Sequence, residues 1–289
     1  MSMPIETIID SLEEKTLSDS GFYWRAQSGV RALVCRELES AGFLNAFSTR
    51  LGGVSPFPKN SMNLAGFDDD TAENIAENRR RFLSALGLSP ESVLLATAWQ
   101  VHGDRVKIIR TRDEALDGNG KFDALASKME NVFVGVKTAD CVPVLIGDPE
   151  SKSFAAVHAG WRGTSLSIVK KAVRVLEKEF NALAESIIAA IGPAAGPQKY
   201  EVGPEVIESL SRTISDIGPF IRPSRSGHST INLPAINQAQ LIDAGLQEKK
   251  IFTAPFCTMT QSDLFFSYRV DRKAFGRTGR LLSIIGKAG

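Results

Sequence analysis

Two apolar runs separated by a short polar turn constrain the fold of this chain more than any other stretch. Residues 142–147 and 153–158 have the composition of strands, and Asp148 to Lys152 between them has that of a turn. In a hairpin, the start of the first strand lies beside the end of the second. We therefore expect Cys141, just before the first strand, to lie close to His158, at the end of the second.

Further strands and helices alternate irregularly along the rest of the chain. This mixture favours an α+β fold, a mixed α/β sandwich in which helices flank large mixed sheets, in one domain. Residues 1–28 are weakly patterned and are expected to form an N-terminal extension, with residues 29–289 as the catalytic domain. The patterns predict strands at 29–35, 43–49, 93–101, 105–109, 132–137, 187–191, 252–254, 264–268 and 281–285, and helices at 70–87, at 164–180 with Thr164 as its N-cap, at 203–213 and at 234–245.

Charge and composition exclude several functional classes. The formal net charge is +1, from 34 basic and 33 acidic residues, so no electrostatic footprint indicates binding to nucleic acid. No apolar run approaches the roughly 20 residues of a membrane span, and the first residues lack the features of a signal peptide. Three widely spaced cysteines do not form a disulfide framework. We expect a cytoplasmic protein that acts on small molecules.

Histidine is scarce in this chain, and its three positions are His102, His158 and His228. His102 and His158, together with Cys141, make a set of nitrogen and sulfur ligands that zinc accepts, and three ligands leave a fourth position open. The separations of 39 residues (102 to 141) and 17 residues (141 to 158) match no zinc-finger pattern. The alternative is a small buried cysteine beside two histidines that have structural roles.

The same three residues suit two other kinds of site. Two histidines and a cysteine with a weak axial methionine, here Met129 or Met259, would make an electron-transfer copper site. A multicopper cluster, by contrast, needs many more imidazoles than three. A cysteine hydrolase would use Cys141 as nucleophile, activated by a histidine.

Several further residues are candidates for contacts with a substrate. Arg162 follows a glycine before a predicted helix and could bind phosphate or carboxylate, although it could equally be a solvated arginine in a turn. Asp140 could orient a metal ligand or merely cap a turn. The remaining candidates lie in or beside loops, which often carry binding groups. They are Ser48, Arg50, Asn63 and Gln100.

A series of short motifs, in this order along the chain, resembles the laccase-domain (YfiH-type) family from about residue 29 to the C-terminus. The motifs are Ser48-Thr-Arg-Leu-Gly-Gly, Asn63-Leu, Gln100-Val-His-Gly, Asp123-Ala-Leu, Thr138-Ala-Asp-Cys-Val-Pro, His158-Ala-Gly-Trp-Arg-Gly, Phe265-Phe-Ser-Tyr-Arg and Thr278-Gly-Arg. The resemblance implies a single-domain sandwich and a metal site at His102, Cys141 and His158, usually holding Zn²⁺, with Cu²⁺ as the alternative.

The resemblance also implies an activity. Members of this family are mostly described as purine nucleoside phosphorylases that also deaminate adenosine and cleave methylthioadenosine. Others are linked to the editing of peptidoglycan precursors, a hydrolase-like role, or to polyphenol oxidation with copper. We expect Cys141, His158 and Arg50 to be catalytic, and Ser48, Arg50, Asn63, Gln100 and Arg162 to bind a purine nucleoside and phosphate, with Arg50 or Arg162 holding the phosphate.

Overall fold

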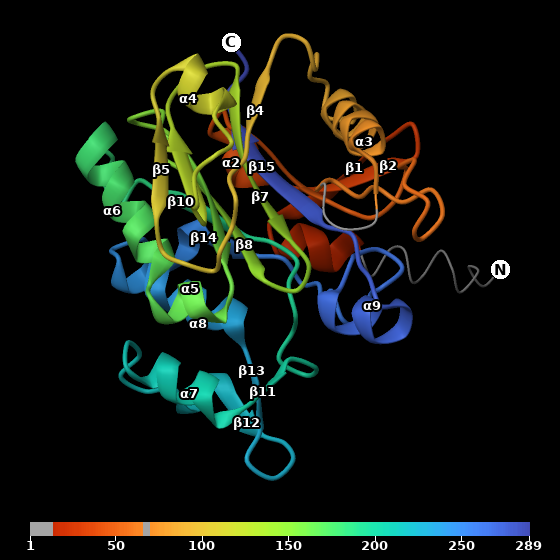
Figure 1. Ribbon diagram of the computed structural model, residues 1–289. Coiled ribbons are helices and arrows are strands. Elements are labelled where there is room, and N and C mark those ends of the chain that lie inside the picture. The colour runs from red at the N-terminus through yellow and green to blue at the C-terminus, as the bar shows by residue number, and fades with distance from the viewer. Residues whose placement is uncertain (1–13, 66–69) are drawn as a thin grey trace, which may run out of the picture.

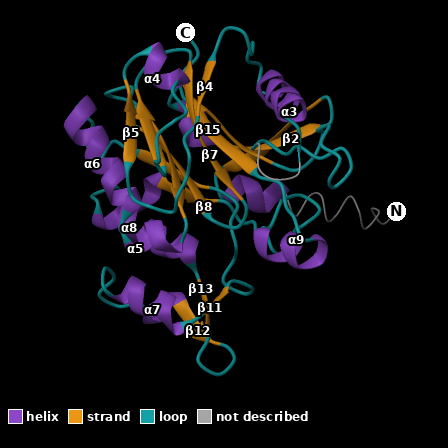
Figure 2. Cartoon of the chain, in the orientation of Figure 1, coloured by secondary structure: helices purple, strands orange, loops and turns teal. Residues whose placement is uncertain are grey.

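The structure is a computed structural model and describes residues 14–65 and 70–289. Two six-stranded mixed sheets pack face to face and helices cover their outer faces (Figures 1 and 2), so the α+β sandwich expected from the sequence is confirmed. One hydrophobic core fills the space between the sheets. A second core lies between the second sheet and its helices, and a third lies between the first sheet and α3 (Ala72–Ala85).

The first sheet reaches further toward the N-terminus than residue 29, because β1 pairs with β2 along its whole length. Its strands are antiparallel except for the pair β7 and β4. Their order is β1 (Phe22–Gln27), β2 (Val30–Cys35), β3 (Leu44–Ser48), β15 (Leu281–Gly286), β7 (Val132–Thr138) and β4 (Leu94–Ala96).

The second sheet contains the predicted hairpin, which is confirmed. Strands β8 and β9 pair antiparallel, with Pro143 opposite His158, so the end of β9 lies beside the start of β8. The outer pairs of this sheet are parallel. The strand order is β14 (Ile251–Thr253), β10 (Ile188–Ile191), β8 (Val142–Gly147), β9 (Phe154–Ala159), β6 (Ala124–Ser127) and β5 (Val106–Ile109).

Helices pack according to which of their faces are apolar. In α6 (Ile168–Phe180), Ile168, Val169, Ala172, Val173 and Leu176 are fully buried against the second sheet. Helix α8 (Leu233–Asp243) packs beside α6 over the same sheet, and α3 covers the first sheet (Figure 1). The short helices are α2 (Arg36–Ser40), α4 (Arg112–Leu116), α5 (Trp161–Ser165), α7 (Pro204–Ser211) and α9 (Tyr268–Phe275), with 3-10 turns at Gly218–Phe220 and Glu248–Lys250.

A small third sheet extends from one end of the sandwich, next to α7 (Figure 1). The sequence patterns did not predict this sheet. Its strands have only two or three residues each, too few to show an alternating pattern. They are β11 (Glu201–Val202), β13 (Ser229–Ile231) and β12 (Ile221–Pro223).

Three predicted elements were wrong. The helix expected from Thr164 is interrupted, because Ser167 adopts a left-handed conformation with φ of 59°; Thr164 lies inside α5, and α6 begins at Ile168. The strand expected at 264–268 is a turn that buries Phe265 and Phe266 between the sheets before α9 begins. The strand expected at 93–101 ends at Ala96, and a loop continues to His102.

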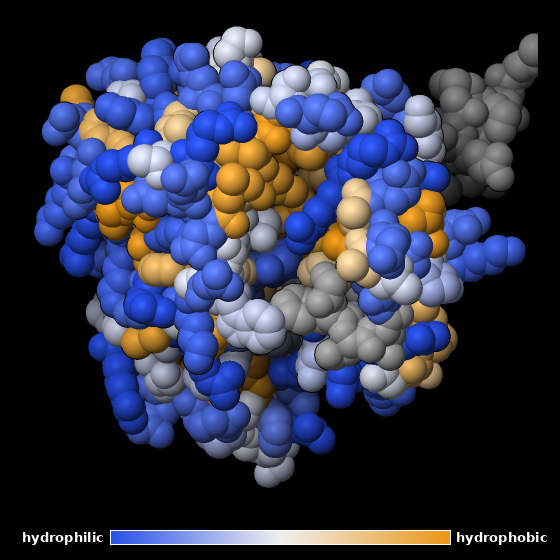
Figure 3. Space-filling model, turned by 45° about the horizontal axis from the view of Figure 1, so that its top comes forward, coloured by the Kyte–Doolittle hydropathy of each residue, from blue (hydrophilic) through white to orange (hydrophobic). Residues whose placement is uncertain are grey.

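The face of the molecule in Figure 3 is mostly hydrophilic; its largest group of hydrophobic residues lies in a hollow near the upper centre, and smaller groups lie to the left and right. In the part of the chain that the structure describes, no helix is both long enough and apolar enough to cross a membrane.

Candidate metal centre

His102, Cys141 and His158 meet at one end of the second sheet, as the sequence predicted. Each offers one ligand atom, and these three atoms lie within 4.8 Å of one another. Cys141 Sγ is 3.7 Å from His102 Nε2, and the centroids of the two imidazole rings are 4.8 Å apart. His158 is rigidly placed in β9, Cys141 directly precedes β8, and His102 lies in a loop with φ of 60°.

Asp123, directly before β6, holds two of these residues at once. Its carboxylate accepts a hydrogen bond from His158 Nδ1 at 2.8 Å, and others from the backbone N–H groups of His102 (2.8 Å) and Gly103 (2.7 Å). The bond to Nδ1 turns Nε2 of His158 toward the site, the arrangement by which carboxylates orient metal-binding imidazoles. The sequence showed Asp123 only as part of a motif. Its role was not predicted.

The three side chains perturb one another's ionisation. Burial opposes the charged form of Cys141, but His158 and the hydrogen bond from His102 outweigh it and lower the pKa of the thiol to about 6. Burial likewise disfavours the His158 cation, yet the Cys141 thiolate and Asp123 raise its pKa to about 9. The pKa of Asp123 is lowered, because the hydrogen bond from His158 and those from backbone N–H groups outweigh its burial. The sulfur is thus poised as a thiolate, the form that binds metals.

These residues fit a zinc ion. Two imidazole nitrogens and a thiolate within one ion's reach are a set that zinc accepts, with room for a fourth ligand. A copper site with an axial methionine fits less well. Met129 packs against the core between the sheets and Met259 against the core under α6, and neither is among the described residues that line the adjoining pocket.

The site opens into a pocket of about 500 Å³, which is large enough for a nucleoside. Three aromatic residues line it: Trp161, Tyr200 and Tyr268. Burial raises the pKa of Tyr200, so its phenol stays neutral. The basic residues of the lining are Lys137, Arg162, Arg269 and Arg280.

Two of the residues expected to bind substrate line this pocket. Arg162 is exposed, and its guanidinium lies 4.3 Å from the centroid of the Trp161 ring. Gln100 also lines the pocket, but its amide is bonded to the backbone of Lys137: Oε1 accepts from the Lys137 N–H, and Nε2 donates to the Lys137 carbonyl, each at 2.7 Å.

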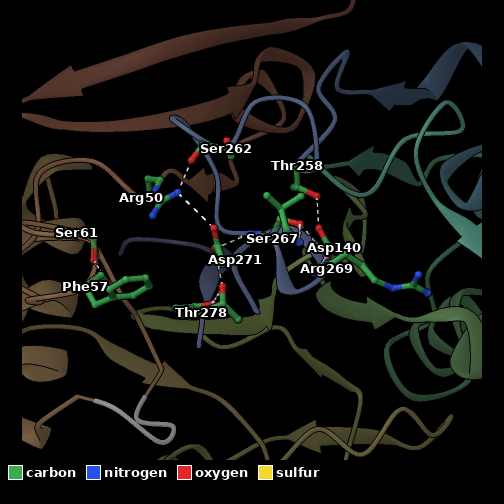
Figure 4. Close-up of polar contacts among 12 residues, drawn as sticks. Arg50, Phe57, Ser61, Asp140, Thr258, Ser262, Ser267, Arg269, Asp271 and Thr278 are labelled. Carbon is green, nitrogen blue, oxygen red and sulfur yellow. Dashed lines mark hydrogen bonds and ion pairs between the residues drawn. The ribbon is translucent and has the colours of Figure 1, made fainter. Parts of the chain in front are cut away.

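Ser48, Arg50 and Asn63 lie outside the lining, in the layer behind it. The Ser48 hydroxyl accepts a hydrogen bond from Leu282 N–H at 2.9 Å. Arg50 is buried; it donates to the Ser262 carbonyl, and its Nη1 lies 3.8 Å from the carboxylate of Asp271 (Figure 4). Asn63 Oδ1 accepts from the Arg280 N–H at 2.9 Å.

Asp140, next to Cys141, is not one of the candidate ligands, and its carboxylate bonds to residues of other segments. Its carboxylate accepts hydrogen bonds from the hydroxyls of Thr258 (2.7 Å) and Ser267 (3.0 Å) and from the Arg269 N–H (2.8 Å), as Figure 4 shows. Asp140 therefore anchors the segment that carries Tyr268 and Arg269, rather than orienting the neighbouring thiol.

The other cysteines do not join the site. Cys35, the last residue of β2, is fully buried in the core between the sheets, and burial raises the pKa of its thiol to about 11. The Cys257 sulfur accepts a hydrogen bond from the Gly196 N–H at 3.1 Å.

Residues 44–288 match the model of the family described as multi-copper polyphenol oxidoreductase laccase, and the chain belongs to this family. A purine nucleoside phosphorylase of Bacteroides thetaiotaomicron is 32% identical over 264 residues, which cover 88% of this chain and 95% of that protein. A purine nucleoside phosphorylase of Deinococcus radiodurans is 35% identical and covers 84% of this chain, with 88% of its own length matched. The crystal structure of YlmD from Geobacillus stearothermophilus superposes with a TM-score of 0.84 at 31% identity, covering 93% of this chain and 99% of that one.

Proposed function

We propose that this protein is a zinc-dependent purine nucleoside phosphorylase. Its substrates would be adenosine, inosine and methylthioadenosine, which it converts with phosphate to the free base and a pentose 1-phosphate, and it would also deaminate adenosine. The observation that carries the proposal is the set of His102, Cys141 and His158 at the base of a pocket lined by aromatic and basic side chains. The purine nucleoside phosphorylases among its relatives give independent support.

Each group of residues has a part in this chemistry. His102, Cys141 and His158 would hold zinc, which supplies a Lewis acid and lowers the pKa of a water molecule, as deamination requires. The aromatic side chains offer flat apolar surfaces against which a purine can stack. The basic residues supply the charge that a phosphate dianion needs.

Phosphorolysis follows from holding the two substrates together. A phosphate oxygen forms a bond to C1′ of the ribose as the bond from C1′ to the purine nitrogen breaks. The base leaves with that electron pair and takes up a proton. Deamination instead adds water at C6 of adenosine and releases ammonia. Most of the acceleration in the first reaction would come from orientation, because the pocket converts an encounter of two molecules into a reaction within one complex.

The site geometry also suits a second candidate, an amide hydrolase, for which the family resemblance suggests peptidoglycan precursors as substrates. Cys141, His158 and Asp123 form a chain of nucleophile, base and orienting carboxylate, with the Asp123 bond to His158 at 2.8 Å. In this reading the Cys141 thiolate would attack an amide carbon. Both candidates need the thiolate, so alkylation of the cysteine does not separate them.

The test is turnover by protein whose metal content has been measured. Adenosine is incubated with and without phosphate, and adenine and inosine are separated by chromatography. We expect adenine only with phosphate, about one zinc per chain, and loss of both in His158→Ala. His228→Ala is the matched control, because His228 is a histidine outside the trio and should retain zinc and activity. Full zinc without any change in adenosine, inosine or methylthioadenosine would contradict the proposal and favour the amide hydrolase.

A further inference from the structure

A purine is recognised by neutral hydrogen-bonding groups, because it carries no charge and its ring nitrogens, N7 among them, accept hydrogen bonds. In the part of the pocket lining that the structure describes, five side chains outside the metal trio offer a neutral N–H or O–H group. They are Gln100, Thr138, Trp161, Tyr200 and Tyr268. The surroundings of each side chain decide whether it can hold a purine in place.

Four of these side chains are bonded elsewhere, enclosed or open to water. The Gln100 amide is bonded to the backbone of β7, and the Thr138 hydroxyl is enclosed by protein. Trp161 is partly exposed and has an arginine against its ring, and Tyr268 is 45% exposed, so water competes for its hydroxyl. Tyr200 is only 7% exposed, which makes it the more water-excluded of the two phenols.

The ring of Tyr200 is anchored in a core, and its hydroxyl lies toward Cys141. The side chain packs in the core between the second sheet and its helices. The backbone is tied on both sides, since the Tyr200 N–H donates to the Gly196 carbonyl and its carbonyl accepts from the Ile231 N–H, each at 3.0 Å. The charges of Cys141 and Asp140, both in the pocket lining, act on the phenol, which places its hydroxyl on the pocket side of the ring.

The phenol is suited to donate a hydrogen bond without losing its proton. Burial raises the pKa of Tyr200 and the charge of the Cys141 thiolate raises it further, whereas Arg269, whose guanidinium lies 5.2 Å from the ring centroid, lowers it in part. The hydroxyl donates to no acceptor within the described part of the chain. A donor that is already in place needs no reorganisation when charge develops on a bound substrate.

Phosphorolysis makes the purine an anion as it leaves. A phosphate oxygen bonds to C1′ of the ribose, the bond from C1′ to N9 breaks, and its electron pair stays on the base. The negative charge spreads over the five-membered ring of the purine to N7. A hydrogen bond to N7 therefore strengthens as the bond to C1′ breaks, and an interaction that is stronger in the transition state than in the ground state accelerates the reaction.

We propose that the Tyr200 hydroxyl donates a hydrogen bond to N7 of the purine and stabilises the base as it leaves. The inference rests on the proposed function, because it assigns a role in the same reaction. The phenol keeps its proton throughout, and the departing base takes its proton from water afterwards. Tyr200 is thus a catalytic residue that acts on the leaving group.

The test compares inosine with 7-methylinosine in the wild-type protein and in Tyr200→Phe. In 7-methylinosine the methyl group blocks N7, and the base leaves without becoming an anion. Removing one hydrogen-bond donor to a developing charge costs about 100-fold in kcat, so Tyr200→Phe should lower the kcat for inosine by about that factor. The kcat for 7-methylinosine should change by less than about threefold, because no bond to N7 is lost.

Tyr23→Phe is the matched control, because it removes a hydroxyl that is bonded to Glu39 outside the pocket, and it should keep the wild-type kcat for both nucleosides. A loss of packing around Tyr200 would slow both nucleosides alike, so equal slowing in Tyr200→Phe would overturn the proposal. An unchanged kcat for inosine in this variant would overturn it as well.

Binding of the free base separates this inference from the proposed function. Titration calorimetry measures the affinity of the zinc-loaded protein for hypoxanthine and for 7-methylhypoxanthine, without phosphate or nucleoside. Tyr200→Phe should bind hypoxanthine about 5-fold more weakly, the loss expected for one hydrogen bond, and 7-methylhypoxanthine as well as the wild type does. This result supports the hydrogen bond even if no nucleoside is turned over. Failure of hypoxanthine to bind the wild-type protein, or equal binding by both proteins, would remove the assignment whether or not the protein is a phosphorylase.

Discussion

Asp123 is the residue on which the geometry of the candidate metal centre depends most, because its carboxylate accepts hydrogen bonds from the ring of His158 and from the backbone of the loop that carries His102. Asp123→Asn keeps the shape of the side chain but removes its negative charge. The amide has one acceptor oxygen in place of two, so it cannot accept all of these hydrogen bonds. We expect its affinity for zinc to fall about 10- to 100-fold. Competition with a chelator of known affinity measures this loss, and Asp117→Asn, at an exposed aspartate, is the control. Wild-type zinc affinity in Asp123→Asn would show that the ligands need no such support.

The chemistry of the sequence predicted the three candidate metal ligands that the structure brings together, but not the carboxylate that supports them. Asp123 lies 21 residues from His102 and 35 from His158, and an aspartate before a strand has no feature that distinguishes a supporting carboxylate from a capping one. Ser48, Arg50 and Asn63 were interpreted as binding groups because of their glycine-rich loop. A glycine-rich loop is equally compatible with residues that do not touch the substrate and instead support the pocket wall through hydrogen bonds.

At the scale of elements, patterns with a strong local signal were predicted well. The hairpin of β8 and β9 has two continuous apolar runs around a turn, and α3 has a capping threonine at its start. The strand prediction at 264–268 was wrong because a short apolar run that is buried as a turn has the same sequence pattern as a strand. The break before α6 was missed because nothing in a serine indicates a positive φ.

The conformation of Ser167 can be tested by substitution. A residue other than glycine in the left-handed region is strained by roughly 1 kcal/mol, so Ser167→Gly should raise the free energy of unfolding by about 0.5–1 kcal/mol. Ser209→Gly, the same change inside α7, should lower it by about as much. Chemical denaturation measures both variants. Destabilisation by both would mean that Ser167 is not strained.

Helix α9 offers a test of the position of Arg50. Arg50 and Asp271 form a buried ion pair behind the pocket, and removing one partner leaves an uncompensated buried charge. Arg50→Met should therefore lower the free energy of unfolding by about 3 kcal/mol, while the zinc content stays at the wild-type level. Arg81→Met, at an arginine that is only half buried, should change it by less than about 1 kcal/mol.

The sequence-based interpretation of Arg50 as a phosphate ligand gives the opposite pattern. A stable Arg50→Met variant with a KM for phosphate raised 10-fold would place the arginine in the binding site and contradict the structural assignment.

At the scale of the whole molecule, the site draws on both sheets. The candidate metal ligands lie at the second sheet and in the loop before β5, whereas two other residues of the pocket lining, Lys137 in β7 and Arg280 directly before β15, come from the first sheet and its edge. The link is short, because Thr138 to Asp140 leads directly from β7 to Cys141. The sequence predicted the fold class from the mixture of elements. The order of strands could not be predicted, because it is fixed by contacts between distant segments such as β3, β15 and β7.

The most direct measurement is phosphorus NMR of a reaction with inosine and inorganic phosphate, using zinc-loaded protein of known metal content. The account predicts a signal of ribose 1-phosphate that grows in equal amount to the hypoxanthine released, as inorganic phosphate falls. Release of hypoxanthine with free ribose and constant phosphate would show hydrolysis instead. Such a result, or no change in inosine at all, would contradict the claim that this pocket joins a purine nucleoside to phosphate.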